Sequence, residues 1–366
     1  MKHKILFILH LPPPVHGAAM MGKYIQDSQT INQYFDSHYF NATLAKDLQD
    51  IGKSGIRKLI NFICQLYHIW KEVKTFQPDL CYVTPSAKGG AFYKDFIIIT
   101  ILKALGQKII IHYHNKGVVT QQDKILDNLL YNYFFKGLKV ILLAEPLYKD
   151  ICKYVNRNDV YFCPNGIPIQ RNLQINKSQD NFNILFLSNM METKGVWDLV
   201  DACRILRERG KKFHCHFVGK WSDITEKEFK QKIHQIDMEK FISAYGAKYK
   251  DEKEEYFQKA SVFIFPTYYS NECFPLVLLE AMEHGIPCIS TFEGGISAII
   301  EEGKTGYLIQ QQQPQVLANK IELLMEQPNL CKAMGEAGRK KFEQEFTLEQ
   351  FEIRMKNILA EVVAKC

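Results

Sequence analysis

The sequence predicts an α/β protein of two domains, each a doubly wound parallel β-sheet with helices on both faces. Short β-branched and aromatic runs alternate along the chain with longer segments of helical periodicity, as they do in βαβ units. The 366 residues exceed one small core and suit two domains. The polar stretch at residues 170–181 lacks apolar periodicity, so we expect it to connect the two domains.

The amino-terminal half is expected to begin with a strand at Lys4 to Leu9. A proline-rich loop then closes on Gly17, and small residues there would allow a ligand to approach the start of the next helix. Further strands are predicted at 80–83, 108–113, 139–143 and 160–162, and the longest helices at 56–76 and 91–105.

The carboxy-terminal half repeats this alternation. A second sheet is expected to begin at 184–188 and to continue at 214–219, 260–267 and 286–291. A helix from Leu276 to Glu283 follows Pro275 and ends before Gly285, and a short helix at 297–301 follows a Gly-Gly turn. Loops at the carboxyl ends of parallel strands are where such sheets bind ligands.

Two carboxylates mark one of these loops. Glu272 precedes the helix and Glu280 lies within it, in the otherwise apolar run Asn271-Glu-Cys-Phe-Pro-Leu-Val-Leu-Leu-Glu-Ala-Met282. A carboxylate in an apolar setting needs hydrogen-bond partners. A buried lysine or backbone amide could supply them, and so could a polar ligand.

Composition narrows the class of protein. Ten cysteines without a C-x-x-C pair indicate reduced thiols in a cytoplasmic protein, with no metal-binding spacing. No apolar run is long enough to span a bilayer. The net charge of +6 comes from an excess of Lys and Arg in residues 1–180, which suits an anionic partner such as a membrane surface or a lipid diphosphate. We expect no nucleic acid, because no nucleic-acid motif accompanies the charge.

The segments "NECFPLVLLEAMEHGIPCIST" and "FEGGISAIIEEGKTGYLI" resemble the retaining glycosyltransferases of family 4, the glycosyl transferases group 1. The resemblance implies the GT-B architecture, two Rossmann-like domains facing each other across a cleft. We expect an acceptor-side domain at 1–170, a linker at 171–181 and a nucleotide-sugar domain at 182–348. The last segment, 349–366, is expected to be a helix crossing back to the first domain.

The resemblance also implies roles for residues around the donor. Glu280 would bind the nucleotide ribose, Glu272 a hydroxyl of the transferred sugar, and Lys194 the diphosphate. Cys273 stands where the family usually has Gly, and Asn189 where it has the Arg of the diphosphate clamp, for which Lys220 is a candidate replacement. The remaining donor-site candidates are Gly17, Phe274, Pro275, Leu276, Gly294 and Gly295, with the amides of Gly295 and Ile296 facing the phosphates.

On the amino-terminal side, the family places a histidine at a strand end near the reacting sugar, and His114 matches it. Strand alternation sends His112 to the same side and Tyr113 to the other. His16, Tyr113 and Lys116 are the acceptor-side candidates. His214 and His216 lack metal partners, and we interpret them as structural.

The implied reaction moves a hexose, with retention and without a metal or other cofactor, to a saccharide or lipid-linked saccharide acceptor in bacterial surface polysaccharide synthesis. The basic segment at 53–74 could lie on anionic lipid at the inner face of the cytoplasmic membrane, although its pattern favours an ordinary sheet-packing helix. A sugar-nucleotide epimerase of the same architecture and a two-lobed sugar-binding protein remain alternatives.

Overall fold

The computed structural model describes residues 2–13, 17–43, 56–170 and 181–365. The chain divides into two compact units, residues 1–165 with 348–366, and residues 166–347. The boundary therefore falls a few residues before the expected linker, whose residues 171–180 lie outside the described part. The last helix belongs to the first unit, in which it packs against α2.

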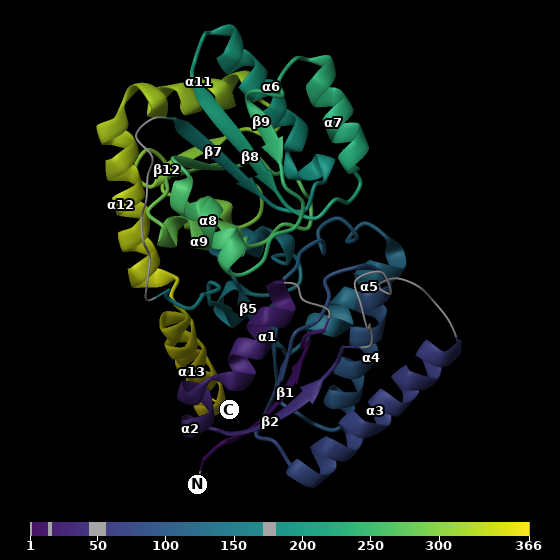
Figure 1. Cartoon of the computed structure of the whole chain (residues 1–366). Helices are drawn as coiled ribbons and strands as arrows, with labels where there is room; N and C mark the ends of the chain where they lie inside the picture. The colour runs from purple at the N-terminus through teal and green to yellow at the C-terminus, as the bar shows by residue number, and fades with distance from the viewer. Residues whose placement is uncertain (1, 14–16, 44–55, 171–180, 366) are drawn as a thin grey trace. The chain divides into compact units, whose positions relative to one another are not determined.

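The first unit contains a sheet in the order β2-β1-β3-β4-β5-β6, in which every pair is parallel. Side chains of its central strands, such as Phe7 and Tyr82, are completely buried. Its elements, coloured purple to blue in Figure 1 apart from the yellow α13, are β1 (Lys4–Leu9), α1 (Gly17–Asp27), α2 (Gln29–Tyr34), β2 (Asp36–Asn41), α3 (Ile56–Phe76), β3 (Leu80–Val83), α4 (Gly89–Ala104), β4 (Ile109–Tyr113), α5 (Ile125–Phe135), β5 (Lys139–Leu142), β6 (Val160–Phe162) and α13 (Leu348–Ala364).

The second unit repeats this plan with a parallel sheet in the order β12-β11-β10-β7-β8-β9. Its core includes the fully buried rings of Phe186, Phe217 and Phe263. Its elements are β7 (Phe182–Leu187), α6 (Val196–Glu208), β8 (Phe213–Val218), α7 (Glu226–Gln235), β9 (Ile242–Ala244), α8 (Asp251–Lys259), β10 (Val262–Phe265), α9 (Leu276–Glu283), β11 (Cys288–Thr291), α10 (Ile296–Ile299), β12 (Gly306–Ile309), α11 (Pro314–Glu326) and α12 (Pro328–Glu345).

The predicted fold class is confirmed, and α3, β3, β6 and α9 have the predicted bounds. The strand β2 was missed because its side chains alternate between exposed and half-buried, so its sequence DSHYFN carries little apolar signal. Pro275 directly precedes α9, as predicted. None of the described helices combines the length and the apolar character needed to cross a membrane.

Candidate functional site

In the second unit the chain reverses its direction of winding between β7 and β10. It proceeds from β7 outward to β8 and β9, then returns to the other side of β7 with β10. Parallel sheets bind ligands at the carboxyl ends of strands beside such a switch point. The loop after β7 carries Lys194, and the loop after β10 carries Glu272, so these two predicted residues lie on opposite sides of it.

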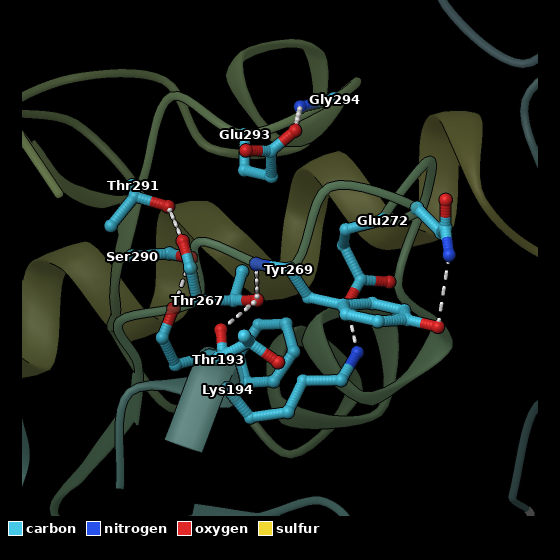
Figure 2. A network of polar contacts seen from close by, with 11 residues as sticks. Thr193, Lys194, Thr267, Tyr269, Glu272, Ser290, Thr291, Glu293 and Gly294 are labelled. Carbon is cyan, nitrogen blue, oxygen red and sulfur yellow. Dashed lines mark hydrogen bonds and ion pairs between the residues drawn. The ribbon is translucent and has the colours of Figure 1, made fainter. Parts of the chain in front are cut away.

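The loops at this edge are tied together by hydrogen bonds (Figure 2). The Tyr268 amide donates to the carbonyl oxygen of Thr193 at 2.8 Å, which joins the β10 and β7 loops. The Thr291 hydroxyl, at the end of β11, donates to the carbonyl oxygen of Thr267. The adjacent strand ends thus hold one another in place, and the side chains that project from them are positioned by backbone contacts.

Lys194 and Glu272 form an ion pair (Figure 2). Each side chain is only 12% exposed. The Lys194 ammonium also lies 4.3 Å from the ring centroid of Tyr269, within reach of a cation–π contact. Gly195 follows with φ +82°, and a Cβ there would lie 2.3 Å from the Pro266 carbonyl oxygen, so only glycine permits this approach of the two loops.

The Gly-Gly turn after β11 packs against the loop that carries Glu272. Gly294 has φ +57°, and a Cβ on it would lie 2.3 Å from the Glu272 carbonyl oxygen. The Gly295 amide donates to the Cys273 carbonyl oxygen at 2.7 Å, and the Ile296 amide to that of Glu293 at 3.2 Å. The expectation that the Gly295 and Ile296 amides face phosphate therefore requires correction, because both are already used within the chain.

Glu280 lies on α9 opposite a lysine that the sequence analysis did not identify. Lys253, on α8, places its Nζ 2.7 Å from Glu280 Oε1. Glu280 Oε2 is buried, and no hydrogen-bond partner for it exists among the described residues. Burial raises the pKa of the Glu280 carboxyl, and the charge of Lys253 opposes this effect. One carboxylate oxygen is therefore paired with Lys253, and the other is buried without a partner among the described residues.

A second buried pair supports this arrangement. His284 Nδ1 lies 2.8 Å from the Glu280 carbonyl oxygen, and its Nε2 lies 2.8 Å from Glu254 Oε2. Lys253 and Glu254 belong to the charged run Lys-Asp-Glu-Lys-Glu-Glu, which in sequence resembles a solvated helix face. No local pattern marks them, because their partners lie 27 and 30 residues further along the chain.

The apolar candidates next to Glu272 turn their side chains inward. Cys273 and Phe274 are each 4% exposed, and the Phe274 ring packs against Phe346 at 5.7 Å. Pro275 is buried and Leu276 half-buried at the start of α9. These residues would meet a donor through backbone atoms and the helix dipole rather than through their side chains.

Asn189 and Lys220 are both exposed at the carboxyl ends of the neighbouring strands β7 and β8. The Met190 amide donates to the Lys220 carbonyl oxygen at 2.8 Å, which holds the two loops side by side. Lys220 is thus placed where it could supply the positive charge that Asn189 lacks.

In the first unit, β4 carries His112 and Tyr113, and His114 follows it. As alternation predicts, the rings of His112 and His114 share a side, with centroids 4.2 Å apart. His112 is fully buried with Nδ1 2.7 Å from the Tyr82 hydroxyl, whereas His114 is half-buried. Tyr113 is 2% exposed and packs against Phe135. The prediction that its side chain contacts an acceptor is therefore wrong, because that side chain lies in the core.

Two other candidates of this unit, Gly17 and Lys116, follow the strands β1 and β4 in the chain. Gly17 is the exposed first residue of α1, and Lys116 is half-buried after β4. His16 lies outside the described residues. Asn115 joins two strand ends, accepting from the Ala87 amide at 2.5 Å and donating to the Pro85 carbonyl oxygen at 3.1 Å.

His214 and His216 are accounted for by ordinary contacts. His214 Nε2 lies 3.0 Å from the Ser243 hydroxyl, and His216 lies 3.1 Å from the Tyr245 hydroxyl. Across the described ranges, no group of three or more His, Cys, Asp or Glu side chains is arranged to hold a metal ion.

The fold places the chain in the GT-B class of glycosyltransferase structures. Anabaena HepE, solved in complex with UDP, superposes with a TM-score of 0.74 at 15% identity, covering 98% of this chain and 100% of HepE. Residues 169–341 match the model of the family glycosyl transferases group 1. This segment, a little under half of the chain, is therefore similar to the glycosyl transferases group 1.

Two relatives that match part of the chain in sequence are glycosyltransferases by name. The amylovoran biosynthesis glycosyltransferase AmsK of Erwinia amylovora is 30% identical over 167 residues, which cover 44% of this chain and 40% of AmsK. The putative colanic acid biosynthesis glycosyltransferase WcaL of Salmonella typhimurium is 27% identical over 183 residues, 48% of this chain and 44% of WcaL. The chain therefore matches less than half the length of these relatives.

Proposed function

We propose that the protein transfers a sugar, with retention of configuration, from a nucleoside-diphosphate sugar to a saccharide or lipid-linked saccharide acceptor. The observation that carries the proposal is the Lys194–Glu272 ion pair across the switch point of the second sheet. The names of AmsK and WcaL support polysaccharide synthesis as the setting, and the UDP complex of HepE supports a nucleotide donor.

The nucleoside end of the donor is assigned to Glu280. A ribose hydroxyl would donate to the buried Oε2, which has no partner among the described residues, while Lys253 keeps the other oxygen neutralised. A hydroxyl that fills this position satisfies a buried acceptor, so binding gains a charge-assisted hydrogen bond and removes a desolvation penalty.

The diphosphate and the sugar are assigned to the other side of the site. Lys194, Lys220 and the amino terminus of α9 at Leu276 would supply positive charge to the departing diphosphate. Glu272 would accept a hydroxyl of the transferred sugar. Because Lys194 and Glu272 neutralise each other in the free protein, donor binding would exchange their ion pair for contacts with phosphate and sugar.

The reaction that follows from these assignments needs no resident metal, because lysines and a helix dipole stabilise the leaving diphosphate. His114 would lie near the reacting sugar, and the leaving phosphate would accept the proton of the acceptor hydroxyl. A lipid-linked acceptor would place the protein at the inner face of the cytoplasmic membrane.

The test is a thermal-shift screen against nucleoside diphosphates and their sugar conjugates. A ligand at a hundred times its Kd stabilises the folded state by about 2.7 kcal/mol. We expect one nucleotide to raise the Tm of the wild type but not of Glu280→Gln, whereas the exposed Glu336→Gln responds like the wild type. An unchanged response of Glu280→Gln would contradict the ribose assignment, and no response to any nucleotide would contradict the proposed donor class.

A further inference from the structure

The helices α3, α4 and α5 form a continuous layer on the sheet of the first unit, with α3 packed against α4 and α4 against α5 (Figure 1). Each buries one side in the core and exposes large apolar side chains on the other. We call these exposed residues the apolar face: Ile60, Ile63, Tyr67 and Trp70 of α3, Tyr93 and Ile97 of α4, and Ile125, Leu126, Leu129 and Tyr133 of α5.

Two of these side chains tie α4 to α5, because the Tyr93 hydroxyl donates to Asp127 Oδ1 at 2.7 Å and the Tyr133 ring lies 5.7 Å from the Phe96 ring, but the others are not needed to pack the helices. On α3, Phe62, Ile69 and Val73 already bury the side toward the sheet. The exposed Tyr67 and Trp70 rings stack on each other instead, with centroids 5.9 Å apart. Ile125, at the start of α5, is 90% exposed. Soluble monomers rarely expose so many large apolar residues on neighbouring elements, and such patches indicate a binding surface.

The charges around the apolar face are predominantly positive. Asp95 and Asp127 are buried, and Glu72 is half-buried and lies 3.2 Å from His38. In the described residues 60–76 and 89–136, Asp123 is the only exposed acid. The exposed basic residues of the same segments are Lys71, Lys74, Lys94, Lys108, Lys124 and Lys136.

We propose that the apolar face docks the protein onto an anionic lipid bilayer. Isoleucine and leucine side chains would enter the acyl boundary, the Tyr and Trp rings would lie at headgroup level, and the lysines would contact anionic headgroups. A second copy of the chain fits less well, because pairing the face with itself would bring two lysine-rich rims together.

This inference does not depend on the transfer reaction, because none of the residues of the apolar face belongs to the proposed donor site. Failure of vesicle binding would therefore leave nucleotide binding by the second unit intact. Loss of nucleotide binding, in turn, would not affect docking. The two proposals can be distinguished by measuring both on the same preparation.

Trp70 provides a reporter within the face. The chain has three tryptophans, so Trp197→Phe/Trp221→Phe leaves Trp70 alone. We expect this protein to co-sediment with vesicles of phosphatidylcholine that contain phosphatidylglycerol, and we expect its Trp70 fluorescence emission to shift to the blue. Added salt should weaken both effects. Vesicles of pure phosphatidylcholine should cause little co-sedimentation and little shift of the Trp70 emission. Sedimentation without a change in Trp70 emission would overturn the proposal, because binding would then use another surface.

The matched variants are Leu126→Ser/Leu129→Ser on the face and Tyr249→Ser, which removes a 70% exposed ring from the second unit. Both variants should melt like the wild type, which shows that they fold. Leu126→Ser/Leu129→Ser should lower the association constant for vesicles by at least about tenfold, whereas Tyr249→Ser should leave it unchanged. Equal binding by both would contradict the proposal. So would dimerisation of the wild type that Leu126→Ser/Leu129→Ser abolishes, because a second copy would then occupy the face.

Discussion

Lys253 Nζ lies 2.7 Å from Glu280 Oε1, while the other carboxylate oxygen of Glu280 is buried without a hydrogen-bond partner among the described residues. The two side chains are each about one-fifth exposed and come from different helices, α8 and α9. Burial raises the pKa of the Glu280 carboxyl, and the Lys253 ammonium opposes this rise, so Lys253 favours the charged carboxylate.

Replacing Lys253 by Met should weaken nucleotide binding. Without the ammonium, the pKa of Glu280 rises further, and the neutral carboxyl makes a weaker hydrogen bond to ribose than the ionised form does. We expect the Kd of the stabilising nucleotide to increase about tenfold at neutral pH and to recover as the pH is raised. Titration calorimetry of the variant across a pH series would measure both effects.

The control for this prediction is Lys259→Met, which removes an exposed lysine from the same helix. It should bind nucleotide like the wild type. In the Glu280→Gln background, Lys253→Met should add little, because the two residues act on the same hydrogen bond. Additive losses would show that Lys253 contributes to binding independently of Glu280.

Removing both Lys194 and Glu272 should lower the free energy of unfolding by less than the sum of the two single losses. Lys194→Met or Glu272→Met alone leaves a mostly buried charge without its partner, which costs about 3 kcal/mol of unfolding free energy. The double variant removes both charges and should lose less than the sum. In a Trp70→Phe background, urea unfolding followed by Trp197 and Trp221 reports the second unit alone. Additivity of the two losses would contradict a direct pair.

Gly294→Ala should disturb the loop that carries Glu272. The new Cβ would lie 2.3 Å from the Glu272 carbonyl oxygen, so the loop must move. Gly303→Ala is a matched control, because Gly303 also has a positive φ, of +73°, but a Cβ there meets nothing within 4 Å. Both variants bear the cost of about 1–2 kcal/mol for a left-handed alanine. Only Gly294→Ala should also reduce the proposed transferase activity, measured as sugar transfer or donor hydrolysis; equal activities would contradict the steric argument.

Asp95→Asn should change how stability depends on pH. Burial raises the pKa of Asp95 to about 6, although the Ser86 amide donates to its Oδ2 at 2.7 Å. The folded carboxyl therefore holds its proton where the unfolded one has lost it, so its stabilisation is complete below pH 4 and is lost as the pH rises to about 6. The Asn variant, which does not titrate, should gain up to about 3 kcal/mol relative to the wild type at pH 8, at roughly 1.4 kcal/mol per pKa unit. Melting curves from pH 4 to 8 measure the difference, and parallel curves would contradict the assignment.

The alternation of strands and helices could be predicted from the sequence because each element carries its own signal. Buried strands such as β3 are continuous apolar runs, and α9 has Pro275 before it and Gly285 after it. The strand β2 could not be predicted in the same way, since an edge strand with exposed side chains is stabilised by its backbone pairing with β1.

Residues of the candidate site could be predicted only where their immediate neighbours in the sequence form a recognisable motif. Glu272 and Glu280 stand out as carboxylates in an apolar run, and Lys194 precedes a glycine that begins a helix. Tyr113 is an acceptor-side candidate because it is next to His114 in the sequence, yet strand alternation directs its side chain into the core. The sequence indicated the direction of its side chain but not that this direction leads away from the site.

By itself, the sequence determined the two-domain α/β plan, the resemblance to a family and the two acidic residues, because periodicity and short motifs express local preferences of the backbone. Only the tertiary structure decided which charges meet. Lys194 pairs with Glu272 across 78 residues and Lys253 with Glu280 across 27, because parallel strand order brings loops and helices of distant sequence to one edge of a sheet. The tertiary structure also turns the Gly295 amide toward the Cys273 carbonyl oxygen in the second unit, and it leaves the apolar face of α3, α4 and α5 exposed in the first.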